Sequence, residues 1–181
     1  MGCLYLIQND THLKNFKGLI TDSDCYIDIG RLMSQKLPIN EIKHGKELRL
    51  EQEGSRFYFL NFIQKIIFLI TLKFNNKQAL SQLEFDKVVI GNDGAIQRLI
   101  IDSLPNKNIA VEMWLDGIIS LRGSYYRNVF KLILSKFASF FSCSYFFPSV
   151  IGFYEKIVCL NVMDDSVKTE YTSFKSFINI D

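Results

Sequence analysis

Residues that break regular structure are scarce in this chain, which holds only 3 prolines and 10 glycines among 181 residues. Disordered and collagen-like chains are rich in these residues, so both classes are excluded. The apolar share of 48% is enough to build a hydrophobic core. At roughly 100–200 residues per domain, the length fits one domain spanning residues 1–181.

The chain also lacks a surplus of either charge, because 21 basic residues face 19 acidic ones and the net charge is +2. Proteins that bind nucleic acids through bulk charge carry a much larger positive excess. We therefore expect no nucleic-acid partner.

Metal-binding and targeting signals are missing as well. No two cysteines share a CxxC spacing, and His12 and His44 are the only histidines. We therefore expect no metal site and free thiols in a reducing compartment. The first residues lack the charged leader and cleavage site of a signal peptide, which favours a cytoplasmic location. The cysteines are Cys3, Cys25, Cys143 and Cys159.

Short continuous apolar runs alternate with segments of helical periodicity along the chain. This alternation predicts an α/β fold: a single Rossmann-like open sheet, mostly parallel, with helices on both faces. Strands are expected at residues 4–7, 25–29, 88–90, 109–115 and 157–160. Helices are expected after a cap at Asp10 or Thr11, around Glu47, and over residues 56–74, 95–104, 125–141 and 165–177.

Polar clusters follow three of the expected strands, at the sheet edge where open α/β sheets bind ligands. These clusters contain Asn9 to His12, Gly91 to Gly94, and Asp116 with Gly117. Each also has a structural interpretation, because the first two suit helix caps and the third suits a turn. The predicted substrate-binding residues are Asn9, Asn92, Asp93, Asp116 and Gly117.

His12 is the predicted catalytic residue, because a neutral histidine at this edge can act as a general base. The alternative for His12 is an ordinary place on a helix surface. His44 lies in a polar stretch and is expected to be solvated. No GxGxxG, P-loop or GxSxG motif is present, so we expect no dinucleotide cofactor and no serine-hydrolase elbow.

Two segments carry a resemblance to a known family. Residues 88–98, VVIGNDGAIQR, are followed by a strand and by Asp116-Gly117, and residues 6–13 read LIQNDTHL. Together they resemble the N-terminal half of bacterial GT-B glycosyltransferases of surface-polysaccharide biosynthesis and the related polyol-phosphate and polysialic acid transferases. In such enzymes a His-Leu pair follows the first strand. Here Asp10-Thr11 replaces the small or aromatic residues often found before that histidine.

The resemblance implies two facing Rossmann-like domains, with the acceptor on the first and a nucleotide-sugar donor on the second. No counterpart of the second domain precedes Asp181, the last residue given. We therefore expect a truncated enzyme or a split subunit that transfers no sugar alone. Its expected partners are a saccharide or lipid-linked acceptor and a separate donor-domain polypeptide. The rival hypothesis is a non-catalytic Rossmann-like domain for binding or regulation.

Two apolar segments bear on membrane contact. Residues 57–72 fall short of the about 20 apolar residues that a bilayer span needs, and polar residues interrupt them. A buried or interfacial helix is therefore expected there. Residues 125–141 carry Arg127, Lys131 and Lys136 beside a broad apolar face. Such a helix either packs on the core or lies on the anionic inner face of the cell membrane.

Overall fold

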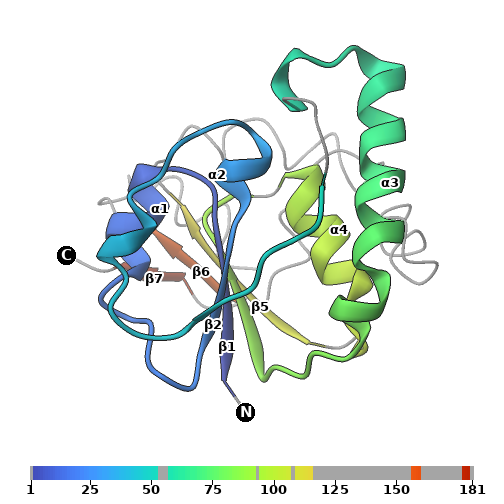
Figure 1. The fold of residues 1–181 in the computed structure, drawn as a ribbon. Coiled ribbons are helices and arrows are strands. Elements are labelled where there is room, and N and C mark those ends of the chain that lie inside the picture. The colour runs from blue at the N-terminus through green and yellow to red at the C-terminus, as the bar shows by residue number, and fades with distance from the viewer. Residues whose placement is uncertain are drawn as a thin grey trace.

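The structure is a computed structural model that describes residues 2–52, 57–92, 94–106, 109–115, 156–159 and 177–179. Helices lie between most of the strands up to β5 (Figure 1). The strands are β1 (Cys3–Ile7), β2 (Cys25–Asp28), β3 (Lys46–Glu47), β4 (Lys87–Ile90), β5 (Ala110–Leu115), β6 (Lys156–Cys159) and β7 (Phe177–Asn179). The α-helices are α1 (Asp10–Phe16), α2 (Ile29–Leu32), α3 (Phe62–Ser81) and α4 (Ala95–Ser103), and short 3-10 turns form η1 (Ile39–Glu41) and η2 (Phe57–Phe59).

The strands within the described ranges form one seven-stranded sheet in the order β3-β2-β1-β4-β5-β6-β7. Each neighbouring pair in it is parallel. Strands β1, β2 and β3 lie side by side in chain order, and β4 then pairs with the other side of β1. The strand order therefore reverses between β1 and β4, which is the topological switch point of a Rossmann-like sheet. The predicted α/β fold is confirmed.

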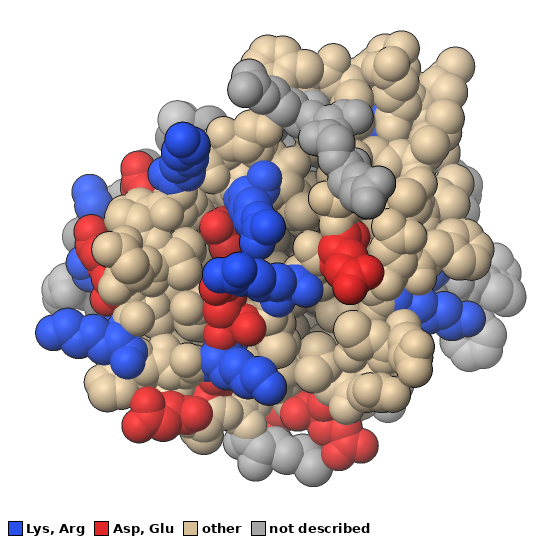
Figure 2. All heavy atoms as spheres, in the orientation of Figure 1, with Lys and Arg blue, Asp and Glu red and all other residues tan. Residues whose placement is uncertain are grey.

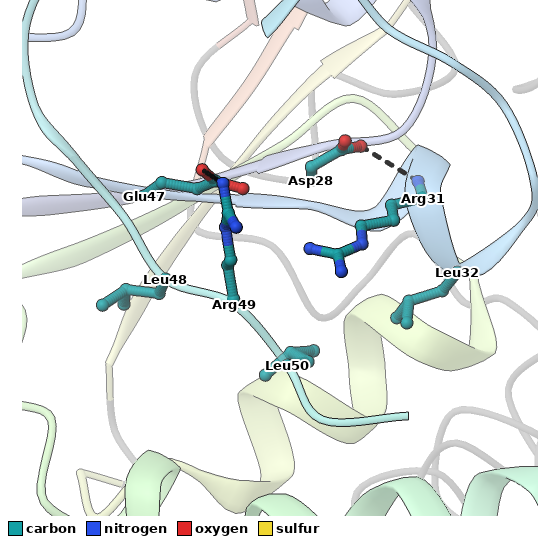
Figure 3. Close-up of a pocket in the computed structure, with 7 residues that line it drawn as sticks. All are labelled: Asp28, Arg31, Leu32, Glu47, Leu48, Arg49 and Leu50. Carbon is teal, nitrogen blue, oxygen red and sulfur yellow. Dashed lines mark hydrogen bonds and ion pairs between the residues drawn. The ribbon is translucent and has the colours of Figure 1, made fainter. Parts of the chain in front are cut away.

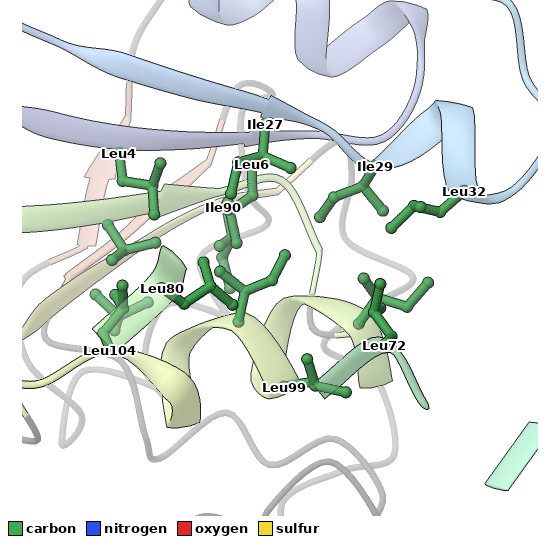
Figure 4. Close-up of a cluster of buried hydrophobic side chains, with 14 of the residues drawn as sticks. Leu4, Leu6, Ile27, Ile29, Leu32, Leu72, Leu80, Ile90, Leu99 and Leu104 are labelled. Carbon is green, nitrogen blue, oxygen red and sulfur yellow. The ribbon is translucent and has the colours of Figure 1, made fainter. Parts of the chain in front are cut away.

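Two hydrophobic cores lie on opposite faces of this sheet. In β1, Leu4 and Leu6 belong to the core that α3 and α4 cover, whereas Tyr5 and Ile7 belong to the core that includes Phe16 of α1. Figure 4 shows the first core, with side chains of the strands meeting those of α3 and α4. Side chains alternate between faces along a strand, so both faces of a doubly covered strand must be apolar. This requirement explains the continuous apolar runs in the sequence.

Helix α3 begins later and ends later than predicted. Asn61 and Gln64 form a capping box at its start, so the helix begins at Phe62, and it runs to Ser81. Its buried Asn76 binds the extended chain after β3: the side-chain oxygen accepts from Glu51 N (2.7 Å) and the amide nitrogen donates to Glu51 O (2.9 Å). Among the residues that the structure describes, no helix meets the length and hydropathy required to cross a membrane.

Several predicted boundaries are wrong, for local reasons. Glu47 lies in strand β3 and not in a helix, because Gly45 turns the chain with a φ of 85° and sets it beside β2. Strand β2 stops at Asp28, which caps α2, and Asn9 caps α1 in place of Asp10 or Thr11.

Two further predictions concern the C-terminal part of the chain. Residues 177–179 form strand β7, although a helix was expected to reach residue 177. Residues 125–141, with Arg127, Lys131 and Lys136, lie outside the described residues, as do residues 165–176.

The buried carboxylate of Asp24 joins the start of β1 to the turn before β2. It accepts hydrogen bonds from Cys3 N (2.7 Å), Thr21 N (2.8 Å) and the Thr21 hydroxyl (2.7 Å). Burial by itself raises the pKa of Asp24, but these hydrogen bonds to the charged form outweigh burial, and the pKa is lowered.

We predict that Asp24→Asn lowers the free energy of unfolding at neutral pH by about 2 kcal/mol, the usual scale for hydrogen bonds to a charged group. Because the folded pKa is lowered, the carboxylate stabilises the fold fully above its unfolded pKa of about 3.9. The contribution is lost as pH falls through the folded pKa. Urea unfolding of the parent and the variant at neutral and acidic pH measures whether the difference between their free energies of unfolding disappears at acidic pH. Asp22→Asn, which removes only an exposed pair with His44, is the control. If the difference in free energy of unfolding stays constant with pH, the charged Asp24 carboxylate is not the stabilising group.

Candidate functional site

His12 lies at the switch point, in the first turns of α1 directly after β1. Asn9 caps this helix, and its side-chain oxygen accepts from His12 N at 2.8 Å. The His12 side chain is completely buried and stacks on Phe16, with ring centroids 6.0 Å apart. The structure therefore places His12 inside the protein at the carboxyl edge of the sheet, and not on a helix surface.

The histidine ring reaches across to the end of β4, where Gly91 makes room for it. A Cβ atom added to Gly91 would lie only 2.1 Å from the ring atoms of His12. Gly91 has no positive φ that would require glycine for backbone reasons. Glycine is needed here because any side chain would collide with the imidazole.

The hydrogen bond to Nδ1 determines what the ring can do chemically. Nδ1 accepts from Gln8 N at 3.3 Å, so the neutral ring carries its proton on Nε2. A general base at this position must use Nδ1 and release the Gln8 N–H group. The predicted catalytic role of His12 stays a prediction.

A network of amide side chains ties α4 to the ends of β1 and β4. Gln97 is fully buried, and its amide nitrogen donates to Gln8 Oε1 and to Asn92 Oδ1. A Cβ on Gly94 would come within 2.3 Å of Gln97 Oε1, so a side chain at the start of α4 would require the Gln97 amide to shift. Helices α1 and α4 lie on opposite faces of the sheet, and His12 of α1 and Gln97 of α4 both hydrogen-bond to Gln8 at the end of β1.

The structure thus brings three predicted site residues to one edge: Asn9, His12 and Asn92. The predicted residues Asp93, Asp116 and Gly117 lie outside the described residues. Gln8 and Gln97 were not predicted. The sequence does contain a signal for Gln97, because it stands beside Ile96 among the apolar residues of α4. A buried amide at such a position is expected only if its hydrogen bonds are satisfied.

A pocket that was not predicted opens at the carboxyl ends of β2 and β3, on the same edge of the sheet. Asp28 and Glu47 are the last residues of these two strands, and Arg31 and Arg49 follow them. The pocket is lined by Asp28, Arg31, Leu32, Glu47, Leu48, Arg49 and Leu50 (Figure 3). Figure 2 shows basic and acidic side chains gathered on this side of the molecule.

The charged groups of this pocket differ in how they are engaged. Arg49 pairs with Glu47 at 2.9 Å, and Asp28 accepts from Arg31 N at 3.1 Å as the cap of α2. Burial raises the pKa of Asp28, and the negative charge of Glu47 raises it further, despite the hydrogen bond from Arg31 N. In Figure 3 the Arg31 guanidinium extends below Asp28 toward Arg49. The pocket therefore offers hydrogen-bond donors and acceptors side by side.

Among the described residues of this edge, metal-ligand side chains do not cluster. Within residues 2–52 and the other described ranges, no three His, Cys, Asp or Glu side chains are grouped as they would be around a metal ion. Cys3 and Cys25 lie on neighbouring strands as free thiols, and burial is the main reason that the pKa of each is raised.

We predict that Gly91→Ala lowers the free energy of unfolding by about 2 kcal/mol, the usual cost of overpacking a filled interior. The same substitution should cost at least about 1 kcal/mol less in a His12→Ala background, because the ring that it meets is then absent. A double-mutant cycle by urea unfolding measures this coupling. Gly18→Ala is the control, since nothing lies within 4 Å of the added Cβ. An equal cost with and without His12 would show that the ring does not press on Gly91.

Comparison with known proteins finds no relative of this chain. No known protein family matches the chain, and neither a curated protein nor a solved structure matches it significantly. The fold class therefore follows from the strand order.

Proposed function

We propose that this chain is a glycosyltransferase-like domain that binds the saccharide acceptor in the biosynthesis of a bacterial surface polysaccharide, such as a capsule or lipopolysaccharide. The observation that carries the proposal is the polar lining of the carboxyl edge. The partly exposed amides Asn9 and Asn92 at the switch point and the charged groups of the β2–β3 pocket lie along one edge of the sheet. Sugar hydroxyl groups both donate and accept hydrogen bonds, so a ligand of this class matches such a lining.

The absence of a phosphate-binding motif also favours an acceptor over a nucleotide. The segment after β1 reads QNDTHL, from the turn into the start of α1, and holds no glycine, whereas a dinucleotide site needs glycines there for close approach to the pyrophosphate. The resemblance of residues 6–13 and 88–98 to acceptor-side domains supports the same assignment. In this proposal, a separate donor domain supplies the nucleotide sugar.

An acceptor hydroxyl that attacks an anomeric carbon must lose its proton. In the proposed mechanism the acceptor oxygen bonds to the anomeric carbon as the bond from that carbon to the donor's phosphate breaks, and the nucleotide diphosphate leaves. His12 takes the hydroxyl proton at Nδ1, which requires that the completely buried ring first opens to the acceptor and releases the Gln8 N–H contact. Asn9 and Asn92 orient the acceptor from the ends of β1 and β4, and Asp93, Asp116 and Gly117 are the proposed further contacts.

A non-catalytic binding or regulatory domain is the second candidate, and one observation favours it. His12 and Gln97 are both 0% exposed, and both take part in hydrogen bonds inside the protein. In that case the carboxyl edge binds a polar ligand and His12 only supports the fold. The two candidates differ in whether replacing His12 affects sugar transfer when a donor domain is supplied.

We predict that the chain binds oligosaccharides of bacterial surface polysaccharides and that Arg31→Ala and Asn92→Ala each weaken binding by about tenfold, the effect of one lost hydrogen bond to a polar ligand group. Titration calorimetry against a panel of such oligosaccharides measures the dissociation constants. Glu84→Ala is the matched control, because Glu84 is exposed just before β4, at the opposite edge of the sheet. The proposal fails if no saccharide binds, or if the control weakens binding as much as the site variants do.

A further inference from the structure

Helix α3 presents a row of large apolar side chains to solvent. Phe62 and Phe74 are 78% and 72% exposed, and Ile63 and Ile67 are 67% and 58% exposed. Ile70, at 39%, lies between them. Residues 63, 67, 70 and 74 are spaced by four, three and four, so they form one line along the helix. We name Phe62, Ile63, Ile67, Ile70 and Phe74 the α3 stripe.

The stripe is distinct from the side of α3 that packs on the protein. Phe68, Leu72 and Leu80 belong to the core, so the helix is already anchored without the stripe. In Figure 1 the first turns of α3 project beyond α4. The structure thus displays a convex apolar ridge that contributes nothing to the core described above. Contiguous exposed apolar surface of this kind marks an interaction site.

The charges around the stripe show which partner it fits. The segment 57–83 contains Lys65, Lys73 and Lys77 and not one acidic residue. Lys77 continues the line of the stripe one turn further, and Lys65 lies over the Phe57 ring at 5.6 Å from its centroid. In Figure 2 the projecting end of the molecule carries no acidic side chains in view. An anionic surface complements this helix, whereas a second copy would bring lysines against lysines.

We propose that the α3 stripe docks the protein on an anionic lipid surface, with α3 lying in the plane of the interface. Phenylalanine and isoleucine side chains enter the boundary of headgroups and acyl chains, and the flanking lysines reach the lipid phosphates. A deformable lipid surface can accommodate a convex ridge, and its anionic headgroups complement the lysines of this helix. The inference rests on α3 alone and does not depend on the proposed saccharide site.

Vesicle co-sedimentation tests the proposal with the full chain. We expect binding to vesicles of phosphatidylcholine mixed with phosphatidylglycerol and much weaker binding to phosphatidylcholine alone. A lysine near an anionic surface contributes about fivefold to partitioning, so Lys73→Gln/Lys77→Gln should lower it about 30-fold. Lys14→Gln/Lys36→Gln, which removes two exposed lysines elsewhere, is the matched control.

A second variant tests the apolar part. Phe62→Gln/Ile63→Gln/Phe74→Gln should abolish binding with an unchanged unfolding midpoint, because these side chains are exposed. Leu19→Gln, an exposed apolar residue outside α3, should bind as the parent does. Three results would overturn the proposal. One is equal binding to both vesicle types, and another is loss only on replacing Arg127, Lys131 and Lys136. The third is a dimer in sedimentation velocity that the stripe variant dissociates.

Discussion

The approach of the His12 ring to Gly91 is the contact on which the centre of this protein depends. It sets the distance between the helix that follows β1 and the end of β4, because the ring fills the space of a side chain at residue 91. Gln97 makes the corresponding link from the other face, through Gln8 and Asn92. Polar groups buried at a switch point must be satisfied, and here each helix supplies hydrogen bonds to the strand ends.

The fold could be predicted from the sequence because parallel strands covered on both faces leave a strong pattern. Runs such as residues 4–7 and 88–90 are continuously apolar, and the structure buries both of their faces. The missed strand β3 has two residues, Lys46 and Glu47, at the edge of the sheet, where neither is required to be apolar. Its position depends on the turn at Gly45, and the periodicity of apolar residues in the sequence does not predict this turn.

The candidate site was predictable only where it follows directly from strand ends. Asn9, His12 and Asn92 come immediately after β1 and β4, so the topology alone assigns them to one edge. Gln97 lies in a helix, and its role appears only when the helix packs against β1. The pocket was missed for a related reason, since Asp28 and Glu47 become neighbours only through the pairing of β2 with β3.

We propose above that a polar ligand binds at the carboxyl edge of the sheet, from the switch point to the β2–β3 pocket. Amide chemical-shift mapping by NMR during titration with an oligosaccharide tests this claim most directly. The largest shifts should fall at residues 8–12, 28–31 and 91–97, where β1, β2 and β4 end. Shifts concentrated at the starts of these strands, near residues 2–3, 24–25 and 84–87, would contradict the account.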